Sequence, residues 1–225
     1  MKLGLVLECD MGGPDELVLI CLARRLNPAA TILPVALGSK EQVFLRGVDV
    51  ARELVEVSAC DRVLIVWDLK PYWQKAATRT CEAEADELRQ KIATTKSSTA
   101  ANISLLCLTW ELETWLIADS RAVNKHLSTG PHVPMFHCSK PLSKTDPKAY
   151  LDRECKKYRG RYQRYVDVRE AIQIARHIPD TKRISRVPSF ARFAGFVCGN
   201  RKAAFKQCGD VCNDLVHQAY QMGKG

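Results

Sequence analysis

The chain has 225 residues, of which 46% are hydrophobic and 26% charged, a composition typical of a globular protein with a buried core. No run of 18 apolar residues occurs, and the first residues, MKLGLVLECDMGG, turn acidic too soon for a signal peptide. We therefore expect a cytoplasmic, bacterial protein without a membrane span. The net charge is +9, and the segment from Lys140 to Lys206 holds 18 lysines and arginines against six acids, which favours an anionic partner there.

Ten cysteines are scattered along the chain, and several lie inside apolar runs such as VLICLAR and SLLCLTW. A secreted disulfide scaffold would be shorter and would place its cysteines in loops. We expect most of them to be free thiols in a reducing cytosol, where the buried ones act as small hydrophobic residues.

Short apolar segments alternate with segments of helical spacing through the first 128 residues. The segments expected to be strands are 2–9, 31–38, 61–68 and 101–110, and those expected to be helices are 10–26, 39–57, 81–95 and 111–127. Pro34 favours an edge position for the second strand, and Ser39 is a candidate cap of the second helix. This alternation predicts an α/β fold with a mostly parallel four-stranded sheet flanked by helices.

The pattern changes after residue 128. Residues 128–148 contain four prolines and no clear period, which predicts a long loop. Further helices are expected at 149–165, 167–178, 189–198 and 206–222. We therefore divide the chain into an α/β domain at 1–128 and a basic, mostly helical region at 129–225 that packs on it.

Acidic residues follow three of the four predicted strands. Glu8 and Asp68 end two of them, and the apolar segment LTWELETWLIAD contains Glu111, Glu113 and Asp119. Ligands of parallel sheets bind beyond the carboxyl ends of the strands, and Mg²⁺ or Mn²⁺ prefers such oxygen ligands. The alternative is that Glu111 and Glu113 lie in a first helical turn and face solvent, with Asp119 also on the surface.

The loop DMGGPDE after the first strand is rich in glycine. Such a loop can present backbone N–H groups and a helix N-terminus to an anion. The chain has neither a Walker lysine motif nor GxGxxG, so a plain tight turn is the favoured interpretation.

Basic and aromatic residues alternate in KKYRGRYQRY. A set that suits phosphates and bases comprises Lys156, Lys157, Arg159, Arg161, Arg164, Tyr158 and Tyr162. With Tyr165, the tyrosines fall on one helical face, so the alternative is that this face packs on the core. Near the C-terminus, Cys198, Cys208, Cys212 and His217 are candidate zinc ligands, but their spacing lacks a CxxC pair and coincidence is favoured.

Four segments resemble the TOPRIM domain and a TOPRIM-like family of uncharacterised proteins found beside ABC- or OLD-type ATPases in bacterial phage-defence loci. LVLECDMGGPDE resembles the first TOPRIM motif, and LIVWDLKP falls where TOPRIM domains carry Asp-x-Asp. LTWELETWLIAD and RVPSFARF are similar to two signatures of the TOPRIM-like family. The resemblance implies a Mg²⁺- or Mn²⁺-dependent nuclease, with a nucleic acid and an ATPase of this kind as partners.

The resemblance also implies roles for the acids. Glu8 would be a general acid/base or a metal ligand, Asp68 a ligand, and Glu111 and Glu113 would complete or support the site, with Glu113 in the catalytic set. The residues that compete for the second acid of the first motif are Asp10, Asp15 and Glu16. Asp119 is a further supporting residue.

One position departs from the TOPRIM pattern. Lys70 stands where the second aspartate of Asp-x-Asp is expected, which leaves a one-metal or inactive site, or a lysine that holds a phosphate directly. Two functions follow from the sequence. The first is a metal-dependent nuclease or toxin effector acting on RNA or DNA, and the second is a non-catalytic partner or regulator of a defence ATPase.

Overall fold

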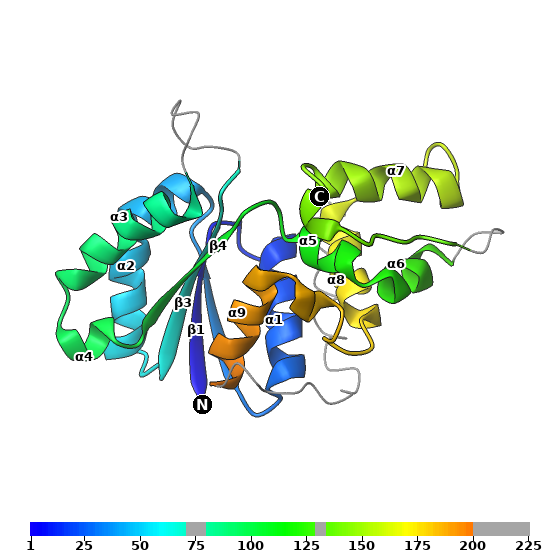
Figure 1. Ribbon diagram of the computed structural model, residues 1–225. Coiled ribbons are helices and arrows are strands. Elements are labelled where there is room, and N and C mark those ends of the chain that lie inside the picture. The colour runs from blue at the N-terminus through cyan, green and yellow to red at the C-terminus, as the bar shows by residue number, and fades with distance from the viewer. Residues whose placement is uncertain (71–79, 129–133, 200–225) are drawn as a thin grey trace.

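The fold is built on a single parallel sheet (Figure 1), seen in a computed structural model that describes residues 1–70, 80–128 and 134–199. Its strands are β1 (Lys2–Leu7), β2 (Thr31–Ala36), β3 (Arg62–Asp68) and β4 (Ile103–Leu108), in the order β2-β1-β3-β4. All three pairings are parallel. The predicted α/β class and four-stranded sheet are confirmed, and Pro34 lies on an edge strand as expected.

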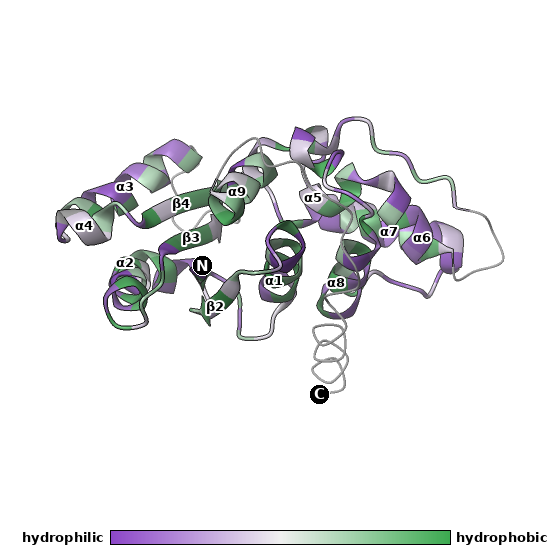
Figure 2. Cartoon of the chain, turned by 90° about the horizontal axis from the view of Figure 1, so that it is seen from below, coloured by the Kyte–Doolittle hydropathy of each residue, from purple (hydrophilic) through white to green (hydrophobic). Residues whose placement is uncertain are grey.

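Helices cover both faces of the sheet. The helices α2 (Lys40–Glu56), α3 (Cys81–Ala93) and α4 (Ser97–Ala100) lie on one side, and α1 (Pro14–Leu26) lies on the other with α9 (Pro188–Cys198) (Figure 1). The central strands are buried on both faces, which explains their nearly continuous apolar sequences. Figure 2 shows these apolar strands between the two helical layers.

Local sequence signals set the ends of these helices. The Ser39 side chain accepts a hydrogen bond from the backbone N–H of Gln42 at 3.3 Å, so the predicted cap of α2 is confirmed. Pro14 occupies the first turn of α1, where a missing N–H has no cost.

The second half of the chain is mainly helical, as predicted. Its elements are α5 (Glu113–Ala118), α6 (Ser120–Leu127), η1 (Pro141–Ser143), α7 (Pro147–Arg159), α8 (Asp167–His177) and η2 (Ile184–Arg186), followed by α9. Helix α8 packs on α1 and α6, and α9 returns to β4. Within the described ranges, no helix is long and apolar enough to cross a membrane.

Two predicted helices end differently in the structure. The helix expected at 111–127 is interrupted at Asp119, whose ψ of 88° is not helical, so α5 and α6 are separate. The helix expected at 149–165 ends at Arg159, because Gly160 adopts a φ of 114° that only glycine adopts readily. The helix expected at 206–222 lies outside the described residues.

The segments LTWELETWLIAD and RVPSFARF, which lie far apart in the sequence, pack on each other. Trp115, in α5, lies with its ring centroid 5.1 Å from that of Phe190 and 5.4 Å from that of Phe193, both in α9. Its indole N–H donates to the hydroxyl of Ser189 at 2.8 Å. Their aromatic residues therefore hold α9 against α5.

The cysteines only partly follow the expectation of free thiols. In the described part of the chain, free cysteines are found at positions 9, 60, 138, 155 and 198. Cys81 and Cys107 instead form a disulfide that joins the start of α3 to β4, with their Cα atoms 5.5 Å apart. Cys81 and Cys107 are therefore exceptions to the expectation that most cysteines are free thiols, because the fold brings two distant positions within bonding distance.

The disulfide predicts a change in titratable thiols. Cys107→Ser is expected to add one free thiol to the unreduced, denatured protein, because Cys81 loses its partner. A thiol-reactive dye under denaturing conditions measures this number. A decrease by one would show that Cys107 is reduced in the wild-type protein.

Candidate active site at the carboxyl edge of the sheet

Glu8 and Asp68 meet at the carboxyl ends of the two central strands. The register of β1 and β3 pairs Leu7 with Val66, so Glu8 and Asp68 extend from neighbouring strands at the same edge. The backbone N–H of Asp68 donates to a carboxylate oxygen of Glu8 at 2.9 Å. Both residues are half-buried. Neighbouring parallel strands thus bring two acids that are 60 residues apart in sequence to one place.

Three further acids approach this pair. Asp15 lies in the first turn of α1, Glu111 precedes α5, and Glu113 begins α5. Burial, followed by the negative charges of Asp15, Glu8, Glu113 and Glu111, raises the pKa of Asp68 well above its ordinary value. We group the five residues whose charges act together here as the carboxylate cluster: Glu8, Asp15, Asp68, Glu111 and Glu113. Among the described residues, the contact found within this cluster is that of Glu8 with Asp68.

The cluster holds its protons more tightly than ordinary acids do. Burial raises the pKa of Glu8 to about 7, although the hydrogen bond from Asp68 and the charge of Lys40 oppose the rise. Burial and the charge of Asp15 raise the pKa of Glu113 to about 8. These shifts mean that the negative charges lie in a poorly solvated place without full compensation, as expected for a site that accepts a cation.

Two lysines whose charges act on the cluster, Lys40 and Lys148, form ion pairs with acids outside it. Lys40 lies 2.9 Å from a carboxylate oxygen of Glu84 and donates to the carbonyl of Leu69 at 2.8 Å. Lys148 forms an ion pair with Asp167. Over the described ranges, no ion pair joins a lysine or arginine to any member of the carboxylate cluster.

Glu111 and Glu113 are also held by their neighbours. Glu111 accepts the backbone N–H of Lys148 at 3.3 Å, at the start of α7. Glu113 is only 5% exposed and accepts a hydrogen bond from the hydroxyl of Tyr165 at 3.2 Å. These two acids therefore connect the sheet edge to the C-terminal helices, and the alternative in which they face solvent does not hold for Glu113.

The carboxylates of Glu8 and Asp68 suit Mg²⁺ that also keeps water ligands. Among the described residues, no three His, Cys, Asp or Glu side chains are arranged as a ready-made metal cage. Mg²⁺ does not need one, because it usually keeps several waters and uses one or two carboxylates together with substrate phosphates. Glu8 and Asp68 provide two such carboxylates at an edge with uncompensated negative charge.

The remaining acids from the sequence analysis lie outside the cluster. Asp10 is exposed and lies beside Gly38, and Glu16 accepts the backbone N–H of Gly12 at 3.0 Å. Asp119 is fully buried, caps α6 through the N–H of Arg121, and pairs with the Arg121 guanidinium at 2.6 Å. Of the three acids that competed in the first motif, the fold therefore brings Asp15 to the cluster. The burial of Asp119 is explained by an arginine, not by a metal.

The glycine-rich loop and Lys70 have structural partners. Gly13 donates to the carbonyl of Asp10 at 2.9 Å, and a Cβ at Gly13 would come 2.8 Å from the same oxygen. The loop is therefore a tight turn in which glycine is required. Lys70 lies over the ring of Trp110, with its ammonium 3.9 Å from the centroid.

The basic segment divides into a packed part and an exposed part. Tyr158 and Tyr165 are buried in the core, as the alternative interpretation expected, and Arg159 pairs with Glu170 at 2.8 Å. Tyr162 is 89% exposed, and the exposed basic residues beside it are Arg161 and Arg164. Lys156 and Lys157 pair with neighbouring acids of α7 at 2.6 and 3.6 Å. The predicted single tyrosine face does not form, because α7 ends at Arg159, before Tyr162.

The sequence was compared with protein-family models, with curated proteins and with solved structures, and nothing matched. What is established is an α/β fold with a four-stranded parallel sheet in the order 2-1-3-4, followed by helices.

The candidate zinc ligands lie mostly outside the described residues. Cys198 is the exception, and its thiol contacts the backbone carbonyl of Leu26 at 3.7 Å. Cys208, Cys212 and His217 belong to the part that the structure does not describe.

Sequence reasoning missed Lys148, whose charge acts on Asp15, Glu111 and Glu113. The segment Thr145–Lys148 reads TDPK, and an aspartate before a proline is a common helix start. In the structure Asp146 caps α7, accepting the N–H of Ala149 at 2.7 Å. This signal would have placed Lys148 in a first helical turn instead of a loop.

Proposed function

We propose that this protein is a Mg²⁺- or Mn²⁺-dependent phosphodiesterase, a nuclease or toxin effector of a phage-defence system that acts on RNA or DNA. The main support is the meeting of Glu8 and Asp68 at the carboxyl edge of the central strands, within a cluster of five acids. The similarity of LVLECDMGGPDE and LIVWDLKP to TOPRIM motifs implies phosphodiester chemistry for Glu8 and Asp68, and LTWELETWLIAD resembles a signature of the TOPRIM-like family.

In this proposal Glu8 and Asp68 would hold the metal, and Glu113 would support the site. The metal would supply a Lewis acid that neutralises a phosphodiester and positions an oxygen. Glu8 has a pKa of about 7, close to the pH of the cytoplasm, which suits a group that takes up and returns a proton. Burial keeps that pKa high, with smaller contributions from the charges of Asp15 and Glu84.

The test is metal-dependent cleavage by the purified full chain. Labelled single- and double-stranded RNA and DNA are incubated with Mg²⁺, with Mn²⁺ or with a chelator. Cleavage that requires the metal supports the nuclease. If no substrate is cut under any of these conditions, the nuclease proposal fails.

Two observations favour the second function, a non-catalytic TOPRIM-like partner or regulator of an ABC- or OLD-type ATPase. Lys70 replaces the second aspartate of Asp-x-Asp and stacks on Trp110. The described residues also contain no group of three metal ligands. Under this alternative the protein would bind its partners without metal-dependent cutting.

The exposed loop after α7 is the proposed contact for the nucleic-acid backbone. Arg161→Ala and Arg164→Ala are each expected to weaken binding of RNA and DNA without sequence preference and to reduce the salt slope of binding by about 1. The measurement is fluorescence anisotropy with oligonucleotides of about 20 residues between about 50 and 200 mM salt.

Arg46→Ala is the matched control for this binding test, because Arg46 is exposed on α2, on the opposite side of the sheet from α7 and α8. If the salt dependence of binding is the same for Arg161→Ala, Arg164→Ala and Arg46→Ala, the loop after α7 does not contact the nucleic acid.

A further inference from the structure

The outer edge of β4 is open. In the described part of the chain β4 pairs only with β3. The carbonyls of Asn102 and Leu108 accept hydrogen bonds from the β3 side, at 2.9 and 2.7 Å. Successive residues of a strand point their backbone groups in opposite directions, so the N–H and C=O groups of Ile103, Leu105 and Cys107 point away from β3. Ile103 and Leu105 also line a groove, so their groups are available to another strand.

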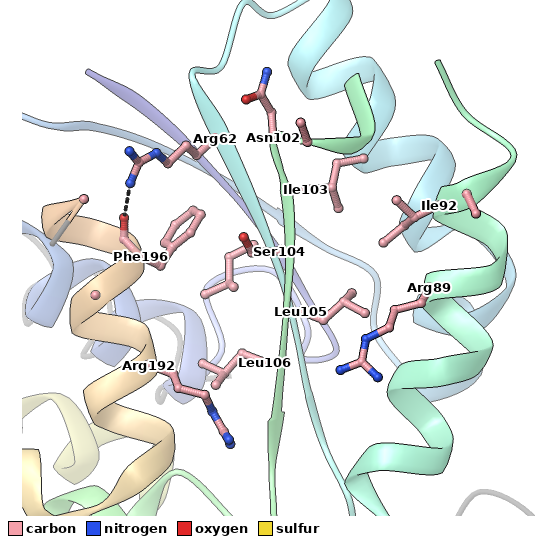
Figure 3. Close-up of a pocket in the computed structure, with 15 residues that line it drawn as sticks. Arg62, Arg89, Ile92, Asn102, Ile103, Ser104, Leu105, Leu106, Arg192 and Phe196 are labelled. Carbon is pink, nitrogen blue, oxygen red and sulfur yellow. Dashed lines mark hydrogen bonds between the residues drawn. The ribbon is translucent and has the colours of Figure 1, made fainter. Parts of the chain in front are cut away.

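A groove follows this edge between α3 and α9 (Figure 3). Its volume is about 880 Å³, and β4 forms its floor, with Ser104 exposed and Leu105 half-buried. The six residues of β4 span about 20 Å, enough for an extended segment of similar length.

The two sheet edges differ in their protection. Exposed strand edges are usually blocked by proline, charged residues or bulges. The opposite edge strand, β2, contains Pro34, whereas β4 reads ISLLCL and contains neither proline nor a charged residue. The β4 edge is therefore fit to accept a strand.

Three arginines surround the groove (Figure 3). Arg62 donates to the carbonyl of Phe196 at 3.4 Å, and Arg89 is paired with acids of its own helix. Arg192 is exposed, and no ion pair with a described residue is found for it. A second copy of this chain would bring a second set of arginines to the same edge, where like charges repel. An acidic occupant is favoured instead.

We propose that the β4 edge binds an extended, acidic segment of another protein, which adds a fifth strand to the sheet. The main-chain groups of Ile103 and Leu105, which line the groove, supply the pairing, and Arg62 and Arg192 select carboxylate side chains. This interaction is independent of metal and of the carboxylate cluster.

The probe is a fluorescein-labelled peptide of about ten alternating Glu and Val residues, titrated with the full chain by fluorescence anisotropy. The matched peptide has Lys in place of Glu and is expected not to bind. Arg192→Glu is expected to weaken binding of the acidic peptide at least about tenfold, and Arg46→Glu on α2 to leave it unchanged. Equal effects of the two substitutions would overturn the role of the groove.

A second arm separates strand pairing from simple charge attraction. The same acidic peptide with N-methylated valines keeps its charge but loses backbone donors on one edge. Leu105→Pro removes a donor that faces the groove and leaves the pairing with β3 in place. Each change is expected to lower affinity at least about tenfold. Unchanged binding of the N-methylated peptide overturns the proposal, and so does a dimer of the chain that Leu105→Pro dissociates.

Discussion

Glu8→Gln and Asp68→Asn are each expected to lower metal-dependent cleavage at least about 100-fold, the usual loss when a positioned acid/base or metal ligand is removed. Both changes keep the size of the side chain and remove its negative charge. In Glu8→Gln the amide carbonyl can still accept the N–H of Asp68, so the strand ends remain connected. Initial rates with labelled RNA and DNA at saturating Mg²⁺ measure the effect.

The two variants are expected to fail in different ways. Asp68→Asn removes a ligand, so more metal will be needed to reach half of the remaining rate. Glu8→Gln removes a titrating group, so the rate of its residual cleavage will lose the inflection near pH 7 that the raised pKa of Glu8 predicts. A purely structural role would produce neither signature.

Asp49→Asn serves as the matched control, because Asp49 is exposed on α2, where it pairs with the exposed Arg52. It is expected to cleave like the wild type. Wild-type rates in Glu8→Gln and Asp68→Asn would mean that any cleavage arises elsewhere in the chain or from a contaminant.

The metal-free protein is expected to become less stable as the pH rises from about 5 to about 8, by at least about 2 kcal/mol in the free energy of unfolding. Burial raises the pKa of Glu8 to about 7 and that of Glu113 to about 8, above their unfolded value of 4.5. The folded state therefore binds more protons than the unfolded state in this range. Its stability is complete below the unfolded pKa and is lost as the pH passes the folded pKa.

Urea denaturation at several pH values measures this slope. Glu113→Gln is the matched variant, since it stays neutral and can still accept the hydroxyl of Tyr165. Its stability is expected to fall less with pH than that of the wild type. Added Mg²⁺ is expected to stabilise the wild type more at the higher pH, because its ligands must first lose their protons. If the free energy of unfolding of both proteins falls equally with pH, Glu113 does not carry an uncompensated negative charge.

The sequence predicted the structure best where a physical rule allows only one or two arrangements of the chain. Continuous apolar strands separated by helices admit little other than a parallel sheet, and carboxyl ends of parallel strands share one edge. The contact of Glu8 with Asp68 followed from these two rules. Pro34 and Ser39 likewise had one favourable position each, at a sheet edge and at a helix start.

Contacts made by tertiary packing could not be read in this way. Arg121 lies only two residues after Asp119, but nothing in this local sequence indicates that Asp180 would hold that arginine at 2.8 Å. Nothing local to Tyr165 places its hydroxyl on Glu113. The approach of Cys81 to Cys107 depends on how α3 returns to the sheet. These pairings are set by the arrangement of whole elements, not by spacing along the chain.

One hydrophobic core runs from the sheet into the last described helix. It joins Leu5 of β1 and Leu22 of α1 with Ile172 of α8 and Phe193 of α9, all less than 2% exposed. Helix α8 lies on α1, and α9 covers β4 beside the groove. One face of β4 therefore stays uncovered until α9 has been synthesised, so native packing over this strand depends on residues that follow it by about 80 positions.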